Sequence, residues 1–265
     1  IIECRYVQRT DDYFIIYLSS HNGCKLSCRF CHLTATGQTE FESVTHEEYI
    51  EQAKIVYDYY DTLGKSADKV HYNFMARGEP FANETIINNG VDVLTELNNI
   101  AQERNINGIC NISTIMPNTI NKPLKDMIGL KGVIPYYSLY SINEKFRKKW
   151  IPKSLPVDHS LGLLKEWQEE SNERIVIHGA VIKDVNDSDK DMNDICDKLI
   201  EYGIKCKLNI VRYNPQSEKY GEEADEQNIE NLVNIFKERL GKENLLMDNT
   251  RIVPRVGYDV SASCG

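Results

Sequence analysis

Runs of apolar and β-branched residues alternate with helical patterns along the whole chain. Six runs are predicted to be strands, at residues 13–19, 69–76, 108–114, 132–141, 174–182 and 206–213, and another lies near 251–253. Helices are predicted at 46–62, 84–104, 119–128, 142–149, 158–170, 187–202 and 225–239. Such alternation predicts an α/β protein with a parallel sheet, either doubly wound or a barrel. In both folds the chemistry lies at the carboxyl ends of the strands.

Length, charge and hydropathy restrict the class further. A chain of 265 residues suits one α/β barrel. With 31 Lys and Arg against 40 Asp and Glu the net charge is −9, so any nucleic-acid site is expected to be local. The longest apolar stretch, residues 13–18, is far shorter than the roughly 20 residues that cross a bilayer, so no membrane partner is expected.

Domain organisation follows from the absence of any linker or low-complexity tract. We expect an N-terminal arm at 1–12, one barrel at 13–245, and a C-terminal strand and tail at 246–265. The chain begins with Ile1 rather than Met, which is consistent with an upstream segment absent from this sequence. No signal peptide is recognisable.

Three of the eight cysteines fall within eight residues, as Cys24, Cys28 and Cys31. Thiolates are the ligands of iron–sulfur clusters, and three cysteines on four irons leave one iron open for chemistry. The alternatives are a structural zinc site completed by His32 or a distant cysteine, and unrelated thiols. Clustered cysteines favour a reducing, cytoplasmic location. Outside the cluster, Cys110, Cys196 and Cys206 are expected in the core.

The spacing C-x-x-x-C-x-x-C after the first strand resembles the signature of radical S-adenosylmethionine (SAM) enzymes. That resemblance implies a partial (β/α)6 barrel with a [4Fe-4S] cluster held by the three cysteines. It also implies that SAM binds the open iron and is cleaved to a 5′-deoxyadenosyl radical. Residues 74–80, FMARGEP, resemble the GEP motif of this superfamily, which receives the methionyl amine; read alone, Gly-Glu-Pro is a turn.

More specifically, the chain resembles the RlmN/Cfr family, radical SAM methyltransferases of adenine carbons in RNA. Residues 19–24 (SSHNGC) resemble the family's SSQxGC, 111–114 its strand ending in Ser-Thr, and 138–140 (SLY) its Ser-Leu-His. Asn143, Arg147, Ile151 and Pro152 recur at its spacing. Residues 184–187 (DVND) resemble its HVND, and 213–215 (YNP) its WNP. The tail matches at Arg255, Gly257, Asp259, Ala262, Cys264 and Gly265.

The family resemblance implies roles for particular residues. Cys264 is expected to carry the methyl group and Glu3 to act as general base, while the substrate is an adenine of ribosomal or transfer RNA, methylated at C2 or C8. An external donor such as flavodoxin or ferredoxin is expected to supply electrons. The residues expected to contact SAM are Gly78, Glu79, Ser113, Ser138, Leu139, Tyr140 and Asn214.

Three departures separate the chain from the family. Tyr17 stands where the family has a second essential cysteine, and a phenol cannot form a disulfide with Cys264. Cys4 is the only other thiol before the cluster, and it is the candidate substitute if the N-terminal arm folds over the barrel mouth. Tyr140 replaces the family's histidine, and the family's N-terminal accessory domain, which helps to grip RNA, has no counterpart in the sequence.

Residues 145–153 (KFRKKWIPK) form the main basic segment. Interleaved aromatics suit phosphate binding and base stacking. Alternatively, Phe146 and Trp150 pack inward at i, i+4 beneath a solvated cationic face.

Two other functions compete with RNA methylation. One is a different radical SAM reaction on a nucleotide, small molecule or peptide, without methyl-cysteine chemistry; the loss of cysteine at Tyr17 and the acidic charge favour it. The other is a zinc or iron–sulfur binding module without activity, which the intact Gly78-Glu79 pair disfavours.

Overall fold

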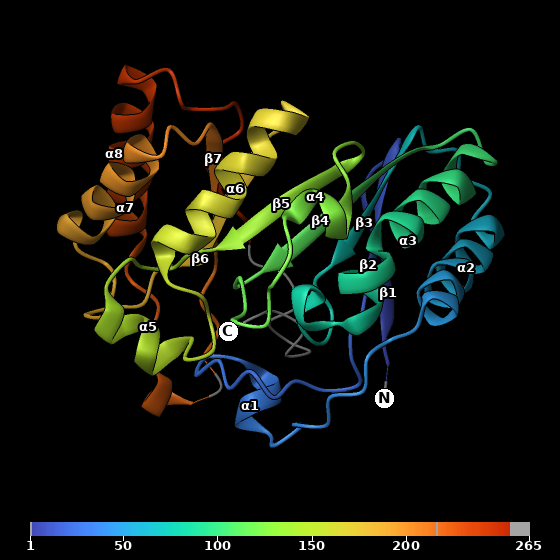
Figure 1. Ribbon diagram of the computed structural model, residues 1–265, viewed down its shortest axis with the longest axis horizontal. Coiled ribbons are helices and arrows are strands. Elements are labelled where there is room, and N and C mark those ends of the chain that lie inside the picture. The colour runs from blue at the N-terminus through green and yellow to red at the C-terminus, as the bar shows by residue number, and fades with distance from the viewer. Residues whose placement is uncertain (1, 216, 255–265) are drawn as a thin grey trace. The chain divides into compact units, whose positions relative to one another are not determined.

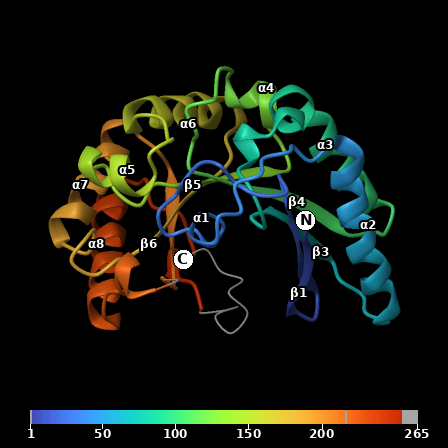
Figure 2. The same cartoon turned by 90° about the horizontal axis from the view of Figure 1, so that it is seen from below.

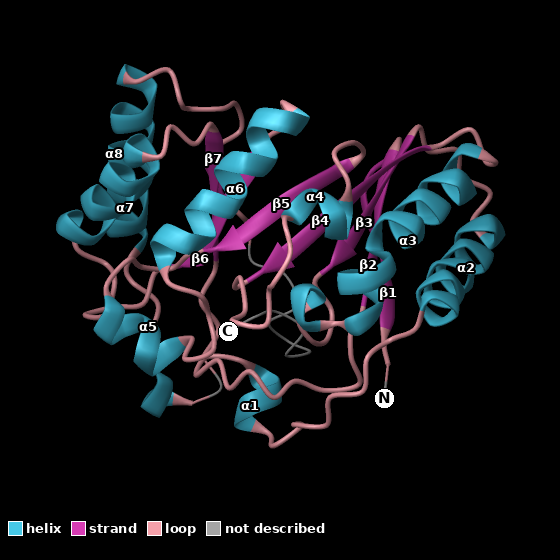
Figure 3. Cartoon of the chain, viewed as in Figure 1, coloured by secondary structure: helices cyan, strands magenta, loops and turns pink. Residues whose placement is uncertain are grey.

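The computed structural model describes residues 2–215 and 217–254, and its chain divides into two compact units (Figure 1). Unit 1 comprises residues 1–25 and 39–135, and unit 2 comprises residues 26–38 and 136–265. Strands and helices alternate in both units, as the colours of Figure 3 show. The predicted tail residues 255–265, including Cys264, lie outside the described residues.

Unit 1 is built on the strands β1 (Cys4–Thr10), β2 (Tyr13–Leu18), β3 (Lys69–Phe74) and β4 (Asn107–Thr114), paired in chain order. Strand β1 is antiparallel to β2, and the other pairs are parallel. Its helices are α2 (His46–Thr62), α3 (Glu84–Gln102), α4 (Leu124–Ile128) and the 3-10 turn η1 (Pro80–Ala82). Helices α2 and α3 lie side by side against the sheet (Figures 1 and 2).

Unit 2 is built on β5 (Val133–Ser138), which starts at the end of unit 1, β6 (Ile175–Ala180), β7 (Cys206–Val211) and β8 (Arg251–Ile252). Neighbours in this order pair in parallel. Its helices are α1 (His32–Ala35), α5 (Glu144–Trp150), α6 (Val157–Ser171), α7 (Asp189–Glu201), α8 (Glu226–Lys242) and the 3-10 turn η2 (Glu218–Tyr220). Helices α7 and α8 pack against each other, and α8 also contacts β7 and β8.

All seven predicted strands and all seven predicted helices are present, so the predicted α/β class is confirmed. The segment expected to be an arm differs, because residues 4–10 form β1 on the edge of β2. Helix α4 is shorter than predicted and starts after Pro123, which disfavours helical backbone at the residue before it. Strand β5 ends at Ser138, because Tyr140 has a left-handed φ of 54°.

The predicted N-cap of α2 is confirmed as a capping box. The Glu48 N–H donates to Thr45 Oγ1 at 3.3 Å, and the Thr45 N–H donates to the Glu48 carboxylate at 2.8 Å. The buried side of α2 packs on β2, where the Phe14 and Tyr60 rings stack with centroids 4.4 Å apart. Across residues 2–215 and 217–254, no helix is long and apolar enough to cross a membrane.

Candidate functional site

The three clustered cysteines lie in the loop between β2 and α1. Cys24 is 8% exposed, while Cys28 and Cys31 are half-buried. A turn joins the last two, because the Cys31 N–H donates to the Cys28 carbonyl at 3.0 Å. None of the seven cysteines among the described residues forms a disulfide. Three thiols in one short loop provide the donor set that a [4Fe-4S] cluster requires.

A single metal ion has no preformed site in the part of the chain that the structure describes, where no three His, Cys, Asp or Glu side chains converge. What supports an iron–sulfur cluster at this loop is its three thiol donors and the contacts that hold the residues next to them.

In unit 2 the residues between Cys28 and Cys31 are anchored on α5. The Arg29 N–H donates to the Trp150 carbonyl at 2.8 Å. The Arg29 guanidinium lies 5.5 Å from the ring centroids of both Trp150 and Tyr220. These contacts fix the backbone of the cysteine loop on a buried aromatic side chain.

Phe30 connects the same loop to the segment predicted to bind SAM. Its ring stacks on Tyr140 with centroids 4.5 Å apart and an interplanar angle of 30°. Tyr140 has a left-handed φ of 54°, which is strained for a residue with a side chain. Asn186 holds this conformation by donating to the Tyr140 carbonyl at 3.0 Å. The contact joins Tyr140 to the part of the cysteine loop that contains Phe30.

Arg147 of α5 holds the other side of that segment. It is 6% exposed, and its guanidinium donates to the carbonyls of Leu139 at 3.2 Å and Ser141 at 3.3 Å. It also donates to Ser154 Oγ at 2.9 Å and to the Leu155 carbonyl at 3.0 Å. A buried guanidinium satisfied by four oxygens fixes the backbone around residues 139–141.

The Gly78–Glu79 turn of unit 1 packs against His21. Gly78 has a φ of 90°, and a Cβ atom there would lie 2.4 Å from His21 Nδ1. The Ser20 N–H donates to the Arg77 carbonyl at 2.7 Å, and the Glu79 N–H donates to His21 Nδ1 at 3.4 Å. The His21 ring stacks on Phe41 at 3.8 Å, and burial lowers its pKa to about 4. Glycine is therefore required by both conformation and space.

Glu79 is 5% exposed and its carboxylate points into unit 1. It accepts from the N–H of Phe81 at 3.1 Å and from the N–H of Ile115 at 3.0 Å. Burial raises the pKa of Glu79 to about 7, although its bonds to Thr114 and the two amides oppose this shift. The carboxylate thus joins the turn after β3 to the end of β4, where predicted Ser113 lies half-buried.

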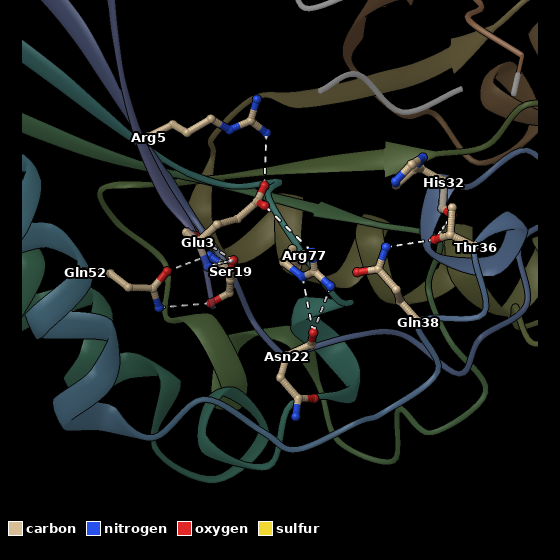
Figure 4. A network of polar contacts seen from close by, with 9 residues as sticks. All are labelled: Glu3, Arg5, Ser19, Asn22, His32, Thr36, Gln38, Gln52 and Arg77. Atoms are coloured by element: carbon tan, nitrogen blue, oxygen red, sulfur yellow. Dashed lines mark hydrogen bonds and ion pairs between the residues drawn. The ribbon is translucent and has the colours of Figure 1, made fainter. Parts of the chain in front are cut away.

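Glu3 lies between two arginines of unit 1 (Figure 4). Its carboxylate is 3.5 Å from the Arg5 guanidinium and 3.8 Å from that of Arg77. Arg77 also donates twice to the Asn22 carbonyl, at 3.0 and 3.2 Å. The backbone of Glu3 is fixed by Ser19, whose Oγ accepts from the Glu3 N–H and donates to the Glu3 carbonyl.

Tyr17 shares the face of the sheet that carries Glu3 and Arg5. It pairs with Arg5 across β1 and β2, and the Arg5 guanidinium lies 5.4 Å from its ring. Cys4 pairs with Leu18 instead, so its side chain lies on the opposite face. Burial raises the pKa of the Cys4 thiol, which disfavours the reactive thiolate. Cys4 is therefore poorly placed to replace the family's second cysteine.

The structure places the remaining predicted residues within unit 2. Ser138 ends β5, Leu139 is fully buried, and Asn214 follows β7 at 7% exposure. In the basic segment, Phe146 and Trp150 are buried and stack on each other at 5.8 Å. The inward-packing interpretation of residues 145–153 is the correct one, because the residues of α5 that face solvent are Glu144, Lys145, Lys148 and Lys149.

Several positioning contacts were not predicted from sequence, namely those of His21, Phe30 and Asn186. His21 and Asn186 fall inside motifs that resemble the family, but the motif itself does not say what the side chain contacts. Phe30 carried no signal beyond its place between two cysteines.

The fold has counterparts among solved structures. Over 100% of this chain and 80% of the other, the fold matches the crystal structure of a radical SAM methyltransferase from Sphaerobacter thermophilus, with a TM-score of 0.73 at 19% identity. It also matches Streptococcus suis SuiB bound to S-adenosylmethionine, with a TM-score of 0.57 at 17% identity over 91% of this chain and 46% of the other. The chain has the fold of radical SAM enzymes, and the predicted partial barrel is confirmed.

Within that class the chain is similar to RlmN. It is 28% identical to the dual-specificity RNA methyltransferase RlmN of a Sulfurovum species, over 95% of this chain and 66% of the relative. Its identity to RlmN of Rhodospirillum rubrum is 28%, over 96% of this chain and 57% of the relative. The predicted RlmN/Cfr resemblance is confirmed, although no family model matches. The chain spans 66% and 57% of the length of these two relatives.

Proposed function

We propose that this chain is a radical SAM methyltransferase that modifies an adenine carbon, C2 or C8, of ribosomal or transfer RNA. The observation that carries the proposal is the similarity to RlmN over 95% of the chain, which includes the cysteine loop and the Gly78–Glu79 turn. Cys24, Cys28 and Cys31 would hold a [4Fe-4S] cluster. With SAM bound, that cluster supplies a 5′-deoxyadenosyl radical.

The chain's own residues position the reactants. Phe30 and Arg29 hold the cysteine loop on Tyr140 and Trp150. The family assigns Gly78, Glu79, Ser113, Ser138, Leu139, Tyr140 and Asn214 to SAM, and in each unit they follow or end a strand. Cys264 is the proposed methyl carrier, since an aromatic C–H of adenine does not react with SAM directly.

Glu3 is the proposed base. Arg5 and Arg77 orient its carboxylate on the face that also carries Tyr17. Tyr17 is a phenol, which can donate a proton but cannot exchange disulfides. Release of a product from Cys264 would therefore use proton transfer. We further propose a reducing cytoplasmic setting and an external flavodoxin or ferredoxin as electron donor.

A second candidate is a radical SAM reaction on a nucleotide, small molecule or peptide without a methylated cysteine. The position of Cys4 favours it, because the face that carries Glu3 and Tyr17 receives no thiol from β1.

Anaerobic reconstitution separates the two functions. The protein is loaded with iron and sulfide, then given SAM, a reductant and total RNA, and analysed by mass spectrometry. The first proposal predicts 5′-deoxyadenosine, a methyl group on the Cys264 peptide and methyladenosine in RNA. Deoxyadenosine without methyl-cysteine would favour the second candidate. Absence of deoxyadenosine would exclude both.

A further inference from the structure

One face of the unit 2 sheet carries a continuous row of polar side chains. Ser138, His178, Asn209 and Arg251 are direct partners across β5, β6, β7 and β8. Partners on paired strands share a face, and residues two apart on one strand share it as well. Cys206 lies near Cys196 of α7 and therefore occupies the opposite, helix-covered face.

Two side chains of this row contain buried polar atoms without a partner. Within the described ranges, the acceptor Asn209 Oδ1 and the ring atom His178 Nδ1 have no hydrogen-bond partner. Asn209 is only 5% exposed. Burial lowers the pKa of His178 to about 4, so its ring is neutral at pH 7 and offers one donor and one acceptor. Leaving such groups unpaired is unfavourable, and a bound molecule would supply the missing hydrogen-bond partners.

Three cations lie next to this row of polar side chains, namely Lys207, Arg174 and Arg251. Lys207 lies two residues before Asn209 on the same face. Its pKa is lowered by burial and then by the charges of Arg174 and Arg251. Arg251 is also the direct cross-strand partner of Asn209, two positions from Lys207. Among the described residues, no carboxylate forms an ion pair with any of the three cations. Mutual repulsion of this kind is relieved by an anion.

We propose that His178, Asn209, Arg174, Lys207 and Arg251, here called the inner strip, bind an adenine nucleotide. Asn209 and His178 hydrogen-bond the base, and the three cations bind its phosphate. An asparagine amide pairs with the N6 and N7 edge of adenine. Asn209 and Lys207 are two positions apart, about 7 Å along the strand, which is comparable with the reach of a nucleotide from base to phosphate.

The phosphate distinguishes this nucleotide from SAM, which has none. Ser138, at the end of the row, belongs to the segment proposed to contact SAM, so the inner strip begins where that segment stops. This inference rests on the proposed function, because it places the target nucleotide on β6–β8 beside the SAM segment. The nucleotide can be free or part of an RNA chain.

Calorimetry on the reconstituted protein tests the inner strip with AMP, adenosine, SAM and an adenine-containing RNA oligonucleotide as separate probes. AMP or the oligonucleotide should bind more tightly than adenosine. Lys207→Gln should weaken AMP or oligonucleotide binding by about tenfold or more and leave adenosine unchanged. Asn209→Ala should weaken AMP and adenosine alike.

Two variants control for folding and net charge. Arg251→Gln alters an exposed side chain on a two-residue edge strand, so it should weaken AMP binding without disturbing the core. Lys237→Gln makes the same change in charge on the exposed side of α8 and should have no effect. If Lys207→Gln weakens binding of the oligonucleotide but not of AMP, the bound nucleotide is part of an RNA chain. If it also weakens binding of AMP, the site accepts a free nucleotide. Both results support the proposal.

Equal binding of AMP and adenosine, or AMP and oligonucleotide binding unchanged in both Lys207→Gln and Arg251→Gln, would overturn the inference. SAM cleavage is measured in parallel on the same samples. Cleavage and RNA methylation that survive in these variants with unchanged RNA binding would refute the inner strip but not the methyltransferase. Nucleotide binding without SAM cleavage would refute the methyltransferase alone.

Discussion

The ring of Tyr140 stacks on the ring of Phe30, with centroids 4.5 Å apart, and so joins the end of β5 to the cysteine loop. Phe30 lies between two proposed cluster ligands, and Tyr140 occupies the position of a family histidine. We infer that either a tyrosine or a histidine ring at position 140 would support the loop by stacking on Phe30. Such a pair is worth about 0.5–1.5 kcal/mol beyond its buried area.

Tyr140→Ala is expected to lower the iron and sulfide bound per chain after reconstitution, because the loop loses its stacking partner. Tyr140→His, which keeps a planar ring, should retain most of the iron. Tyr59→Ala removes a tyrosine ring that is 54% exposed on α2 and serves as the control. Full iron content in Tyr140→Ala would show that the stacking does not support the cluster.

Arg147→Met is expected to lower the free energy of unfolding by about 3 kcal/mol, because four buried oxygens lose a charged donor. Lys148→Met on the exposed side of the same helix loses one i,i+4 pair with Glu144, worth at most about 0.5 kcal/mol. Urea titration measures both. Equal effects of the two substitutions would contradict the positioning role of Arg147.

Gly78→Ala is expected to destabilise the protein by about 2 kcal/mol or more and to weaken SAM binding. The new Cβ would meet His21 at 2.4 Å in a left-handed conformation. Gly162→Ala provides a matched comparison, because that glycine lies inside α6 with no atom within 4 Å of its Cβ position. It should stabilise the chain by about 0.5–1 kcal/mol. Thermal unfolding and SAM titration measure both variants. A Gly78→Ala variant as stable as Gly162→Ala would contradict the prediction.

Glu79 should make stability depend on pH. Because its pKa is raised to about 7 by burial, its contribution is fully present below the unfolded pKa of about 4.5 and is lost as the pH rises through about 7. At about 1.4 kcal/mol per pKa unit, the loss amounts to about 3 kcal/mol. Glu79→Gln should therefore become more stable relative to wild type as the pH rises from 4.5 to 8. Glu51→Gln, an exposed carboxylate of α2, is the control, and parallel profiles for Glu79→Gln and wild type would contradict the assignment.

Tyr17 should limit product release. Tyr17→Cys restores the family's thiol on the face of Glu3 and is expected to raise multiple turnover of RNA methylation, because a thiol can resolve the adduct on Cys264. Tyr17→Phe removes only the hydroxyl and should lower turnover by at least about tenfold if the phenol donates a proton. Single-turnover yields control for substrate binding. Unchanged turnover in both variants would exclude a role for this position.

The sequence by itself determined the order of seven strands and seven helices, although not β1 or α1, since apolar periodicity and capping residues such as Thr45 act over a few neighbouring residues. It also located the cysteine triad and the Gly78–Glu79 turn, because each is a short motif within a single loop. The resemblance to radical SAM enzymes followed from those local patterns.

Only the tertiary structure decided which side chains support these motifs. His21 and Gly78 are far apart in sequence, as are Phe30 and Tyr140, and their contacts arise from the pairing and packing of distant strands. The face on which Cys4 lies was likewise set by the register of β1 against β2, because a shift of one residue would move every side chain to the other face. The inner strip came from the same cause: Arg174, His178, Asn209 and Arg251 meet only because parallel pairing aligns three strands that are separated by helices.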